Sequence, residues 1–317
     1  MLHLITGGAG FIGSHLAEAL VSRGNAVTVL DDLSTGRAEN MRTLEGKPGF
    51  RFVQGSVTAE QPLADLVAAA DVIFHLAAAV GVDLIVKRPV HTIETNIHGT
   101  EIVLKLADRR KTRILLASTS EVYGKGTRVP FGEDDDCVLG PTSRSRWSYA
   151  CSKAVDEFLA LSYFKERHLP AVIARLFNTV GSRQVGQYGM VLPRFIAQAR
   201  AGGPITVYGD GTQSRCFCDV ADVVDALIRL SETPAATGQV FNVGSTDEIT
   251  IHALAEKVRD RVAPRAEIVH VPYDKAYEAG FEDLQRRVPD ITRIRRVTGW
   301  TPRKSLDDII EGILAAG

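Results

Sequence analysis

The stretch LITGGAGFIGSHLAEAL (residues 4–20) joins a short apolar segment to a helical pattern through a run of spaced glycines. Gly8, Gly10 and Gly13 follow a predicted strand (2–6) and open a predicted helix (11–23). Glycines there permit a tight turn and a close approach of the backbone, so a pyrophosphate can lie against the free N–H groups of the helix N-terminus. The stretch therefore predicts a dinucleotide site in the first strand–helix unit of an α/β fold.

Short apolar, β-branched runs alternate with helical patterns through the first half of the chain. Further strands are predicted at 26–30, 50–54, 71–77, 113–118 and 171–177, and further helices at 62–69, 92–109 and 147–167. Because the strands are almost continuously apolar, we expect them to pair in parallel and to be covered by helices on both faces. The predicted fold class is α/β, a doubly wound parallel sheet of the Rossmann type.

After about residue 178 the pattern loosens, because glycine and proline become frequent. Helices are predicted near 190–201, 220–231, 250–262 and 305–314. We interpret residues 1–177 as a dinucleotide-binding domain and residues 178–317 mainly as a smaller α/β lobe that binds the substrate. Segments near 205–245, including VFNVGS (240–245), are expected to contribute to the first domain. The acidic run EDDD (133–136) is interpreted as a solvated loop.

The composition limits the possible partners. The chain has 317 residues, 45% of them hydrophobic and 24% charged, which is typical of a globular protein. Its net charge is −1 and its pI is about 6.7, so no overall basic field attracts nucleic acid or an anionic membrane surface. The longest apolar stretch (66–86) contains Asp71, His75 and Asp83, so no membrane span is predicted.

The cysteines indicate a reducing compartment. They form no CxxC pair and have no histidine at metal-ligand spacing; they are Cys137, Cys151, Cys216 and Cys218. We therefore expect a cytoplasmic protein with buried thiols and without a metal site. The first predicted strand begins within two residues of the N-terminus, which leaves no room for a signal peptide.

The second predicted strand ends in Asp31, 18 residues past Gly13. A carboxylate there can accept hydrogen bonds from a ribose diol and would repel a 2′-phosphate. The sequence therefore favours NAD over NADP, although Arg37 lies nearby. The alternative is a tight strand-to-helix turn without a ligand.

RWSYACSKAVDEF (146–158) places Tyr149 and Lys153 four residues apart on one face of a predicted helix. A lysine ammonium beside a phenol favours the phenolate, so we expect the pKa of Tyr149 to be lowered. The phenolate would remove a hydroxyl proton, and Thr119 or Ser120 at the preceding strand end would share the substrate hydroxyl. Such a pair alone is more often packing on an amphipathic helix, but its occurrence with the glycine pattern favours catalysis.

Five motifs in order carry a resemblance that covers essentially the whole chain. They are TGGAGFIG (6–13), HLAA (75–78), STSEVYG (118–124), YACSK (149–153) and RLFNTVG (175–181). Together they resemble the extended short-chain dehydrogenase/reductase family that modifies nucleotide sugars. The resemblance implies that tightly bound NAD oxidises a sugar 4-hydroxyl, that the keto intermediate is altered, and that hydride usually returns.

The family's site residues are carried over by motif position. Thr119 resembles the hydroxyl partner, Tyr149 the base and Lys153 its supporting cation. The implied cofactor contacts, besides Tyr149 and Lys153, are Gly7, Gly10, Phe11, Ile12, Gly13, Asp31, Ser56, Val57, Leu76, Ala77, Ala78 and Asn96. The implied substrate contacts are Lys87, Arg88, Asn178, Arg183, Tyr208, Gln213, Arg215 and Arg287. The family also implies a homodimer formed through the helices at 92–109 and 147–167.

Glu121 in STSEVYG separates the possible reactions. It resembles the base of the 4,6-dehydratases and the carboxylate of the UDP-glucuronate decarboxylases, whereas simple 4-epimerases need no further acid or base. The lead-in RWSYACSK and the stretch AYEAGFEDLQRRVPD (276–290) resemble the decarboxylase branch, in which Arg215 would meet the sugar near the lost carboxylate. Ser120 stands where dehydratases usually carry Asp or Thr. Lys87 or Arg88 is a further candidate to meet a carboxylate, and Glu121 as a plain loop residue stays an alternative.

The sequence thus favours a cytoplasmic enzyme that decarboxylates UDP-glucuronate to a UDP-pentose, with Thr119, Ser120, Glu121, Tyr149, Lys153 and Arg215 as catalytic residues. The first alternative is 4-epimerisation of a UDP-hexose or UDP-hexuronate, and a 4,6-dehydratase is a further one. A catalytically silent NAD-binding sensor or scaffold is disfavoured, because Thr119, Tyr149 and Lys153 are all present.

Overall fold

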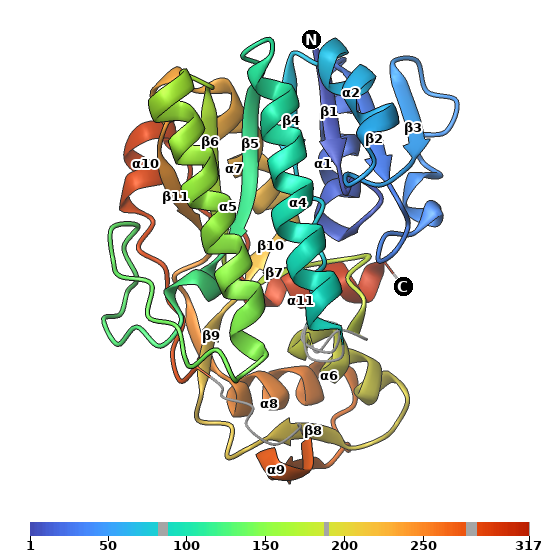
Figure 1. The fold of residues 1–317 in the computed structure, drawn as a ribbon. Helices are drawn as coiled ribbons and strands as arrows, with labels where there is room; N and C mark the ends of the chain where they lie inside the picture. The colour runs from blue at the N-terminus through green and yellow to red at the C-terminus, as the bar shows by residue number, and fades with distance from the viewer. Residues whose placement is uncertain (82–87, 187–189, 277–283, 317) are drawn as a thin grey trace.

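The computed structural model describes residues 1–81, 88–186, 190–276 and 284–316 (Figure 1). Its centre is a seven-stranded parallel sheet in the order β3-β2-β1-β4-β5-β6-β11. The strands are β1 (Leu2–Thr6), β2 (Ala26–Asp31), β3 (Phe50–Gln54), β4 (Val72–His75), β5 (Arg113–Thr119), β6 (Ala171–Leu176) and β11 (Val240–Val243). The prediction of a doubly wound α/β fold is confirmed, including the six strands of the first half of the chain.

Helices cover both faces of the sheet. In Figure 1, α4 (Pro89–Asp108) and α5 (Arg146–Arg167) lie in front of it, while α1 (Phe11–Ser22) and α7 (Val220–Glu232) lie behind. The front core also contains α2 (Glu60–Ala69). Successive strand residues enter opposite cores: Leu4 packs with the front cluster and Ile5 with the back cluster. The uninterrupted apolar strands in the sequence follow from this double burial.

The rest of the chain builds a smaller unit at the bottom of Figure 1. Its apolar cluster contains Leu192, Val207, Leu254 and Ile309. The elements are β7 (Thr179–Val180), α6 (Val191–Arg200), β8 (Ile205–Tyr208), β9 (Ser214–Cys216), β10 (Cys218–Asp219), β12 (Glu248–Thr250), α8 (Ile251–Val262), β13 (Ile268–Val271), α9 (Tyr273–Ala276) and α11 (Leu306–Ala315). Helix α10 (Thr292–Thr298) packs against β11 instead, with Ile294 in the back cluster. The division of the chain at residue 177 stays an interpretation.

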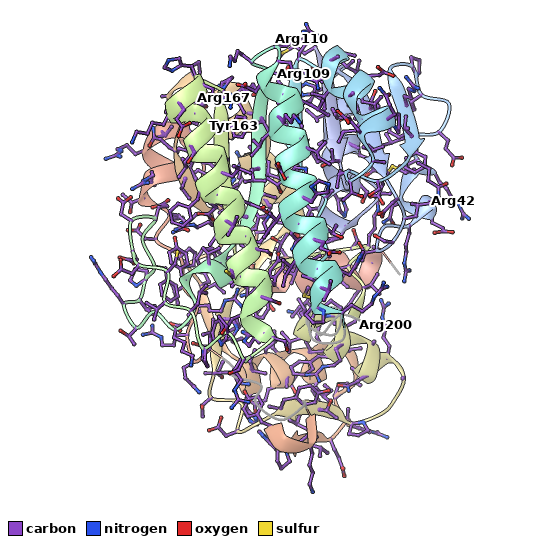
Figure 2. The ribbon with its side chains drawn as sticks, in the orientation of Figure 1. Arg42, Arg109, Arg110, Tyr163, Arg167 and Arg200 are labelled. Atoms are coloured by element: carbon purple, nitrogen blue, oxygen red, sulfur yellow. The ribbon has the colours of Figure 1, made fainter. Side chains whose placement is uncertain are left out.

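Positive charge gathers at the C-terminal ends of the two front helices. Figure 2 shows Arg109, Arg110 and Arg167 together at the upper end of α4 and α5. Arg109 caps α4, and Arg167 lies in the last turn of α5 with its guanidinium over the ring of Tyr163. Cations there complement the negative end of each helix dipole. The same dipoles direct their positive ends toward the other edge of the sheet.

Two predictions about individual residues were wrong. Glu133 in the acidic run is buried, because its Oε1 accepts the backbone N–H of Asn242 at 2.9 Å; Asp134 beside it is solvated at 86% side-chain exposure. Cys216 and Cys218 are buried, but Cys137 and Cys151 are exposed, in a loop and on the outer surface of α5 respectively; all four are free.

Of the described helices, none combines the length and apolar character that crossing a bilayer requires.

A buried ion pair joins α5 to the sheet close to the ends of β5 and β6. Arg175 on β6 donates through Nη2 to Glu157 Oε2 at 2.7 Å and through Nε to Oε1 at 3.0 Å. Ser118 on β5 donates to the same carboxylate. The two charged side chains are only 7% and 6% exposed. Removing one partner of such a pair leaves an uncompensated charge in the interior.

We predict that Glu157→Gln lowers the free energy of unfolding by about 3 kcal/mol, because Arg175 keeps its charge without the carboxylate. Urea denaturation followed by circular dichroism measures this. Glu311→Gln is the matched control: Glu311 pairs with Arg261 at the surface, so its loss should cost less than about 1 kcal/mol. Equal effects of the two substitutions would contradict the prediction.

Candidate active site

A cavity of about 550 Å³ opens at the carboxyl ends of the sheet strands. Strand β1 lies between β2 and β4, so the direction in which strands are added reverses there. Ligands of open α/β sheets bind outside the strands at such a reversal. The cavity extends from the glycine-rich turn after β1 to residues of the smaller unit, including Tyr208 and Tyr273. It therefore has room for one long ligand or two that meet.

The glycine-rich turn forms one end of the cavity. Gly7 adopts a left-handed backbone conformation (φ +73°), and a Cβ there would lie 2.7 Å from the backbone nitrogen of Ala77. A Cβ on Gly10 would meet only the carbonyl oxygen of Gly7, at 3.2 Å, and Gly10 lines the cavity. The missing side chain of Gly10 thus leaves the helix N-terminus open to a ligand, as a bound pyrophosphate requires.

Asp31 lies at the end of β2 beside this turn. Its Oδ2 accepts the backbone N–H of Ala9 at 2.9 Å, and its Oδ1 accepts that of Leu33 at 2.8 Å. These bonds hold the carboxylate at the cavity, where it can still accept from a diol. Arg37 lines the same region.

Most of the residues predicted to contact the cofactor line the cavity. They are Gly7, Gly10, Phe11, Ile12, Gly13, Asp31, Val57, Leu76, Ala77, Ala78, Tyr149 and Lys153. Two do not line it. Ser56 bonds to the hydroxyl of Thr58, and the buried Asn96 accepts from the N–H of Ala79 at 2.8 Å and donates to Ser152 at 3.1 Å. The Asn96 side chain therefore supports the cavity wall by its hydrogen bond to the backbone of Ala79, which lines the cavity.

Strand β5 and helix α5 bring Thr119, Glu121, Tyr149 and Lys153 to the middle of the cavity. Thr119 ends β5 and caps a short 3₁₀ turn (Ser120–Tyr123), with its Oγ1 accepting the N–H of Glu121 at 3.2 Å. That turn directs the Glu121 side chain to the cavity. Ser120 is buried behind it and accepts a hydrogen bond from Arg287 instead of lining the cavity.

The expectation that the pKa of Tyr149 is lowered was wrong. Burial raises the pKa of Tyr149 above its usual value, and the negative charges of Glu121 and Asp156 raise it further, while a hydrogen bond with Thr119 lowers it. Lys153 does not offset this, because its Nζ pairs with Asp156 Oδ2 at 2.8 Å inside the protein. This environment therefore favours the protonated phenol.

Glu121 is held by arginines from three parts of the chain. Arg287 Nη1 donates to its Oε1 at 2.6 Å, and Arg146 on α5 lies 3.3 Å from its Oε2. Burial alone would raise the pKa of Glu121, but the charges of Arg287, Arg146 and Arg215 outweigh it and leave that pKa below its usual value. Glu121 is thus an ionised carboxylate in a positively charged recess beside Tyr149.

The residues predicted to contact the substrate are distributed along the same cavity. Those that line it are Arg88, Asn178, Arg183, Tyr208, Gln213, Arg215 and Arg287. Lys87 lies outside the described residues. Arg183 donates to Glu18 of α1 at 2.7 Å, at the end near the glycine-rich turn. Gln213 donates to the carbonyl of Tyr208 at 3.0 Å, which fixes the aromatic end of the cavity.

The sequence reasoning did not predict every cavity residue, and Arg146 and Arg194 are two that it missed. Arg146 lies one turn before Tyr149 on α5, and this i, i+3 spacing was a usable signal. Arg194 on α6 places its guanidinium carbon 3.8 Å from the ring centroid of Tyr208. No local sequence pattern predicts that Arg194 contacts Tyr208, because the contact follows only from the packing of α6 beside β8.

The comparisons with known proteins agree with this geometry. A family model described as GDP-mannose 4,6 dehydratase matches residues 4–313. The chain belongs to this family. Its resemblance to nucleotide-sugar enzymes of the extended short-chain dehydrogenase/reductase type is therefore confirmed.

Individual relatives in the family narrow the comparison. UDP-N-acetyl-alpha-D-glucosaminuronate decarboxylase of Bacillus cytotoxicus is 43% identical over 95% of this chain and 93% of its own length. UDP-glucuronic acid decarboxylase 2 of Arabidopsis thaliana is 38% identical, and the match covers 96% of this chain and 65% of that protein. The solved structure of UDP-glucuronic acid 4-epimerase from Bacillus cereus, in complex with UDP-glucuronic acid and NAD, is 27% identical with a TM-score of 0.89, covering 100% of this chain and 98% of that one.

We predict that Asp156→Asn lowers the pKa of Tyr149, because it removes one of the negative charges that raise it. Ultraviolet titration of tyrosinate, read against a Tyr149→Phe baseline, should show ionisation beginning at lower pH than in the unmodified chain. Asp260→Asn on the exposed surface of α8 is the control and should leave the titration unchanged. An Asp156→Asn titration that does not move, or that moves upward, contradicts the prediction.

Proposed function

We propose that this protein is an NAD-dependent decarboxylase of a UDP-linked uronate, which it converts to a UDP-pentose. One observation carries the proposal: the ionised Glu121 and the arginines 146, 215 and 287 meet at the cavity beside Tyr149 and Thr119. A positively charged recess is suited to a substrate carboxylate. The relatives named as decarboxylases of two uronates support the same assignment.

The NAD site would be the end of the cavity at the glycine-rich turn. Gly10 leaves space for the pyrophosphate at the N-terminus of α1, and Asp31 would accept from a ribose diol while repelling a 2′-phosphate. When bound, NAD supplies hydride acceptance from a sugar carbon and hydride return to it. Tyr149 and Lys153 line the cavity between this end and the positively charged recess, so they would contact a sugar bound there.

Oxidation at C4 would depend on Thr119 and Tyr149. Both would contact the sugar 4-oxygen, with Tyr149 Oη taking the hydroxyl proton and Thr119 Oγ1 orienting that oxygen. Burial and the charges of Glu121 and Asp156 raise the pKa of Tyr149, so positive charge beside the phenol would be needed to favour the phenolate.

The resulting β-keto acid would lose carbon dioxide by cleavage of its C5–C6 bond. The bonding electrons pass into an enolate over C5, C4 and the 4-oxygen, which Tyr149 and Thr119 would stabilise by hydrogen bonding. Glu121 competes with the substrate carboxylate for the arginines, so the loss of a neutral molecule relieves repulsion between two anions. C5 then takes a proton from solvent, C4 takes back hydride, and Tyr149 returns its proton to the 4-oxygen, which leaves a UDP-pentose and unchanged cofactor.

A 4-epimerase is the second candidate, supported by the likeness to the UDP-glucuronic acid 4-epimerase structure. In that reaction Arg146, Arg215 and Arg287 would hold the carboxylate while the keto sugar turns over, and every carbon would be retained. Glu121 would then position the arginines without taking part in bond cleavage.

The assembly and the compartment are further proposals. We propose that two copies pair through α4 and α5, on which Val90, Ile93, Val155 and Phe158 are exposed apolar side chains, Phe158 at 71%. A cytoplasmic protein, a lobe of residues 178–317 that mainly binds the nucleotide sugar, and a site without metal are proposed on the same footing.

The reaction itself is tested with purified protein, NAD and either UDP-glucuronate or its 2-acetamido analogue, followed by proton NMR and carbon dioxide release. We expect carbon dioxide and a UDP-pentose in equal amounts. Glu121→Gln should lower kcat by about 10²-fold, because it removes the repulsion between two anions that carbon dioxide release relieves. Its control, Glu311→Gln on the surface of α11, should leave kcat unchanged. A product with all its carbons and an inverted C4 would replace the decarboxylase with the epimerase.

The cofactor site is tested separately by Gly10→Ala. The added methyl would occupy the space at the helix N-terminus, so we expect the Kd for NAD to rise at least about tenfold, which corresponds to about 1.4 kcal/mol. Gly312→Ala is the matched control, because a Cβ there meets nothing within 4 Å on an exposed helix position. Calorimetry measures the Kd for NAD of both variants. Equal Kd values would show that the cofactor does not bind at the glycine-rich turn.

A further inference from the structure

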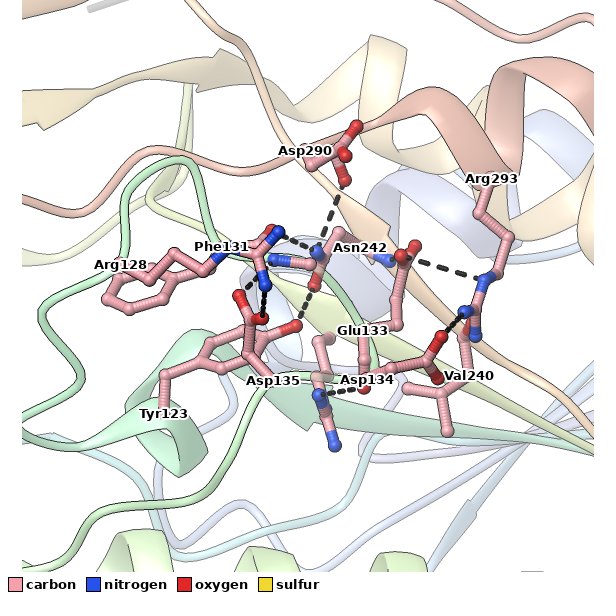
Figure 3. A network of polar contacts seen from close by, with 12 residues as sticks. Tyr123, Arg128, Phe131, Glu133, Asp134, Asp135, Val240, Asn242, Asp290 and Arg293 are labelled. Carbon is pink, nitrogen blue, oxygen red and sulfur yellow. Dashed lines mark hydrogen bonds and ion pairs between the residues drawn. The ribbon is translucent and has the colours of Figure 1, made fainter.

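Asn242 on β11 is fully buried and lies at the centre of the polar network in Figure 3. Its Oδ1 accepts the hydroxyl of Tyr123 at 2.7 Å. Its Nδ2 donates to the carbonyl of Phe131 at 2.8 Å and to that of Asp290 at 3.2 Å. Every N–H of the side-chain amide is therefore used, which identifies one amide orientation and a fully satisfied interior group.

These bonds join segments that are distant in sequence. Tyr123 ends the 3₁₀ turn that begins with Ser120, and Asp290 follows the stretch that contains Arg287. Phe131 bridges them further, because its N–H donates to the carbonyl of Val288 and its carbonyl accepts the N–H of Asp290, each at 2.8 Å. Asn242 thus ties the turn after β5 to the segment 284–290.

The Glu121–Arg287 ion pair crosses between the same two segments. Glu121 is two residues before Tyr123, and Arg287 is three residues before Asp290. Their 2.6 Å contact joins residues 166 positions apart, so no local structure can set its length. The register has to come from contacts between the segments. The Asn242 amide is a buried group that contacts both, in addition to the backbone bonds of Phe131 and the bond from Arg287 to Ser120.

We propose that Asn242 is a positioning residue that holds Arg287 against Glu121 and so prepares the carboxylate recess before substrate binds. The proposal rests on the function proposed above and deepens it. A second contact, from Ser214 N–H to the carbonyl of Gln285 at 2.9 Å, anchors the other end of the segment to the smaller unit. Losing Asn242 therefore displaces Arg287 without releasing the whole segment.

The expected consequence is a change in the chemical step. Asn242→Leu keeps the branching of the side chain but removes its hydrogen bonds with the Tyr123 hydroxyl and with the carbonyls of Phe131 and Asp290, so the segment shifts. We expect kcat to fall about tenfold or more while KM changes less than about threefold, because Asn242 does not line the cavity. Asp222→Asn, which disturbs a buried carboxylate on α7 that accepts the backbone N–H groups of Arg303 and Lys304, controls for general destabilisation and should leave both constants unchanged.

The pH profile separates positioning from plain loss of stability. The charged or titratable groups that face Glu121 are Arg287 from the segment 284–290, Arg146 and Tyr149 from α5, and Arg215 from β9. Activity requires the carboxylate, so it is lost as the pH falls through the pKa of Glu121. Withdrawing Arg287 raises that pKa, and the acid limb of kcat should therefore move to higher pH in Asn242→Leu only.

A double-mutant cycle tests whether Asn242 acts through Arg287. If it does, Asn242→Leu should have little further effect on kcat in an Arg287→Gln background. Additive losses, or an acid limb that stays in place, overturn the proposal. If Asn242→Leu does not fold, Tyr123→Phe removes one of the three side-chain hydrogen bonds and should shift kcat and the acid limb in the same direction by less; an unshifted Tyr123→Phe profile then overturns it.

The unmodified chain separates the two proposals. If the unmodified chain releases carbon dioxide and the pH profile of kcat for Asn242→Leu matches that of the unmodified chain, only the role proposed for Asn242 is overturned. An unmodified chain that inverts C4 and keeps every carbon overturns the decarboxylase. The same variants and the same cycle are then scored on the epimerised product, where coupling between Asn242 and Arg287 supports the positioning role and additivity overturns it.

Discussion

Parallel pairing of the strands is the constraint on which the site depends. Seven strands run in one direction, so their carboxyl ends meet at a single edge, and the residues that follow β1, β2, β4 and β5 have to gather there. The helices return the chain on both faces, which buries the strands completely and leaves that edge as the place for polar groups. Asp31, Thr119 and the glycine-rich turn all reach the cavity through this arrangement.

Charge is the second organising feature, because the net charge of −1 offers no general attraction for an anionic substrate. Arginines from α5, β9 and the segment 284–290 are concentrated instead at one carboxylate, Glu121. Their combined effect keeps Glu121 ionised although it is buried. A second ion pair joins Lys153 to Asp156, and burial together with the negative charges of Glu121 and Asp156 raises the pKa of Tyr149.

Local patterns explain why much of the fold and part of the site could be predicted. The β-branched runs located the strands, and the four-residue spacing placed Tyr149 and Lys153 on one face of α5. The same helix also carries Asp156 three residues after Lys153, a spacing that was available in the sequence. Burial and the charge of Glu121 raise the pKa of Tyr149 most, and Asp156 raises it further. Glu133 was predicted to be solvated because its acidic neighbours are; its burial depends on a bond to β11, more than a hundred residues away.

The sequence by itself determined the doubly wound sheet, the glycine-rich turn, Asp31 at the end of β2 and the Thr119, Tyr149 and Lys153 set, because each depends on residues close together in the chain. Only the tertiary structure decided that Arg287, Arg146 and Arg215 surround Glu121, that Arg194 stacks on Tyr208, and that Asn242 joins the segments holding Glu121 and Arg287. These contacts cross long stretches of chain, and their distances are set by packing between elements for which no local periodicity carries information.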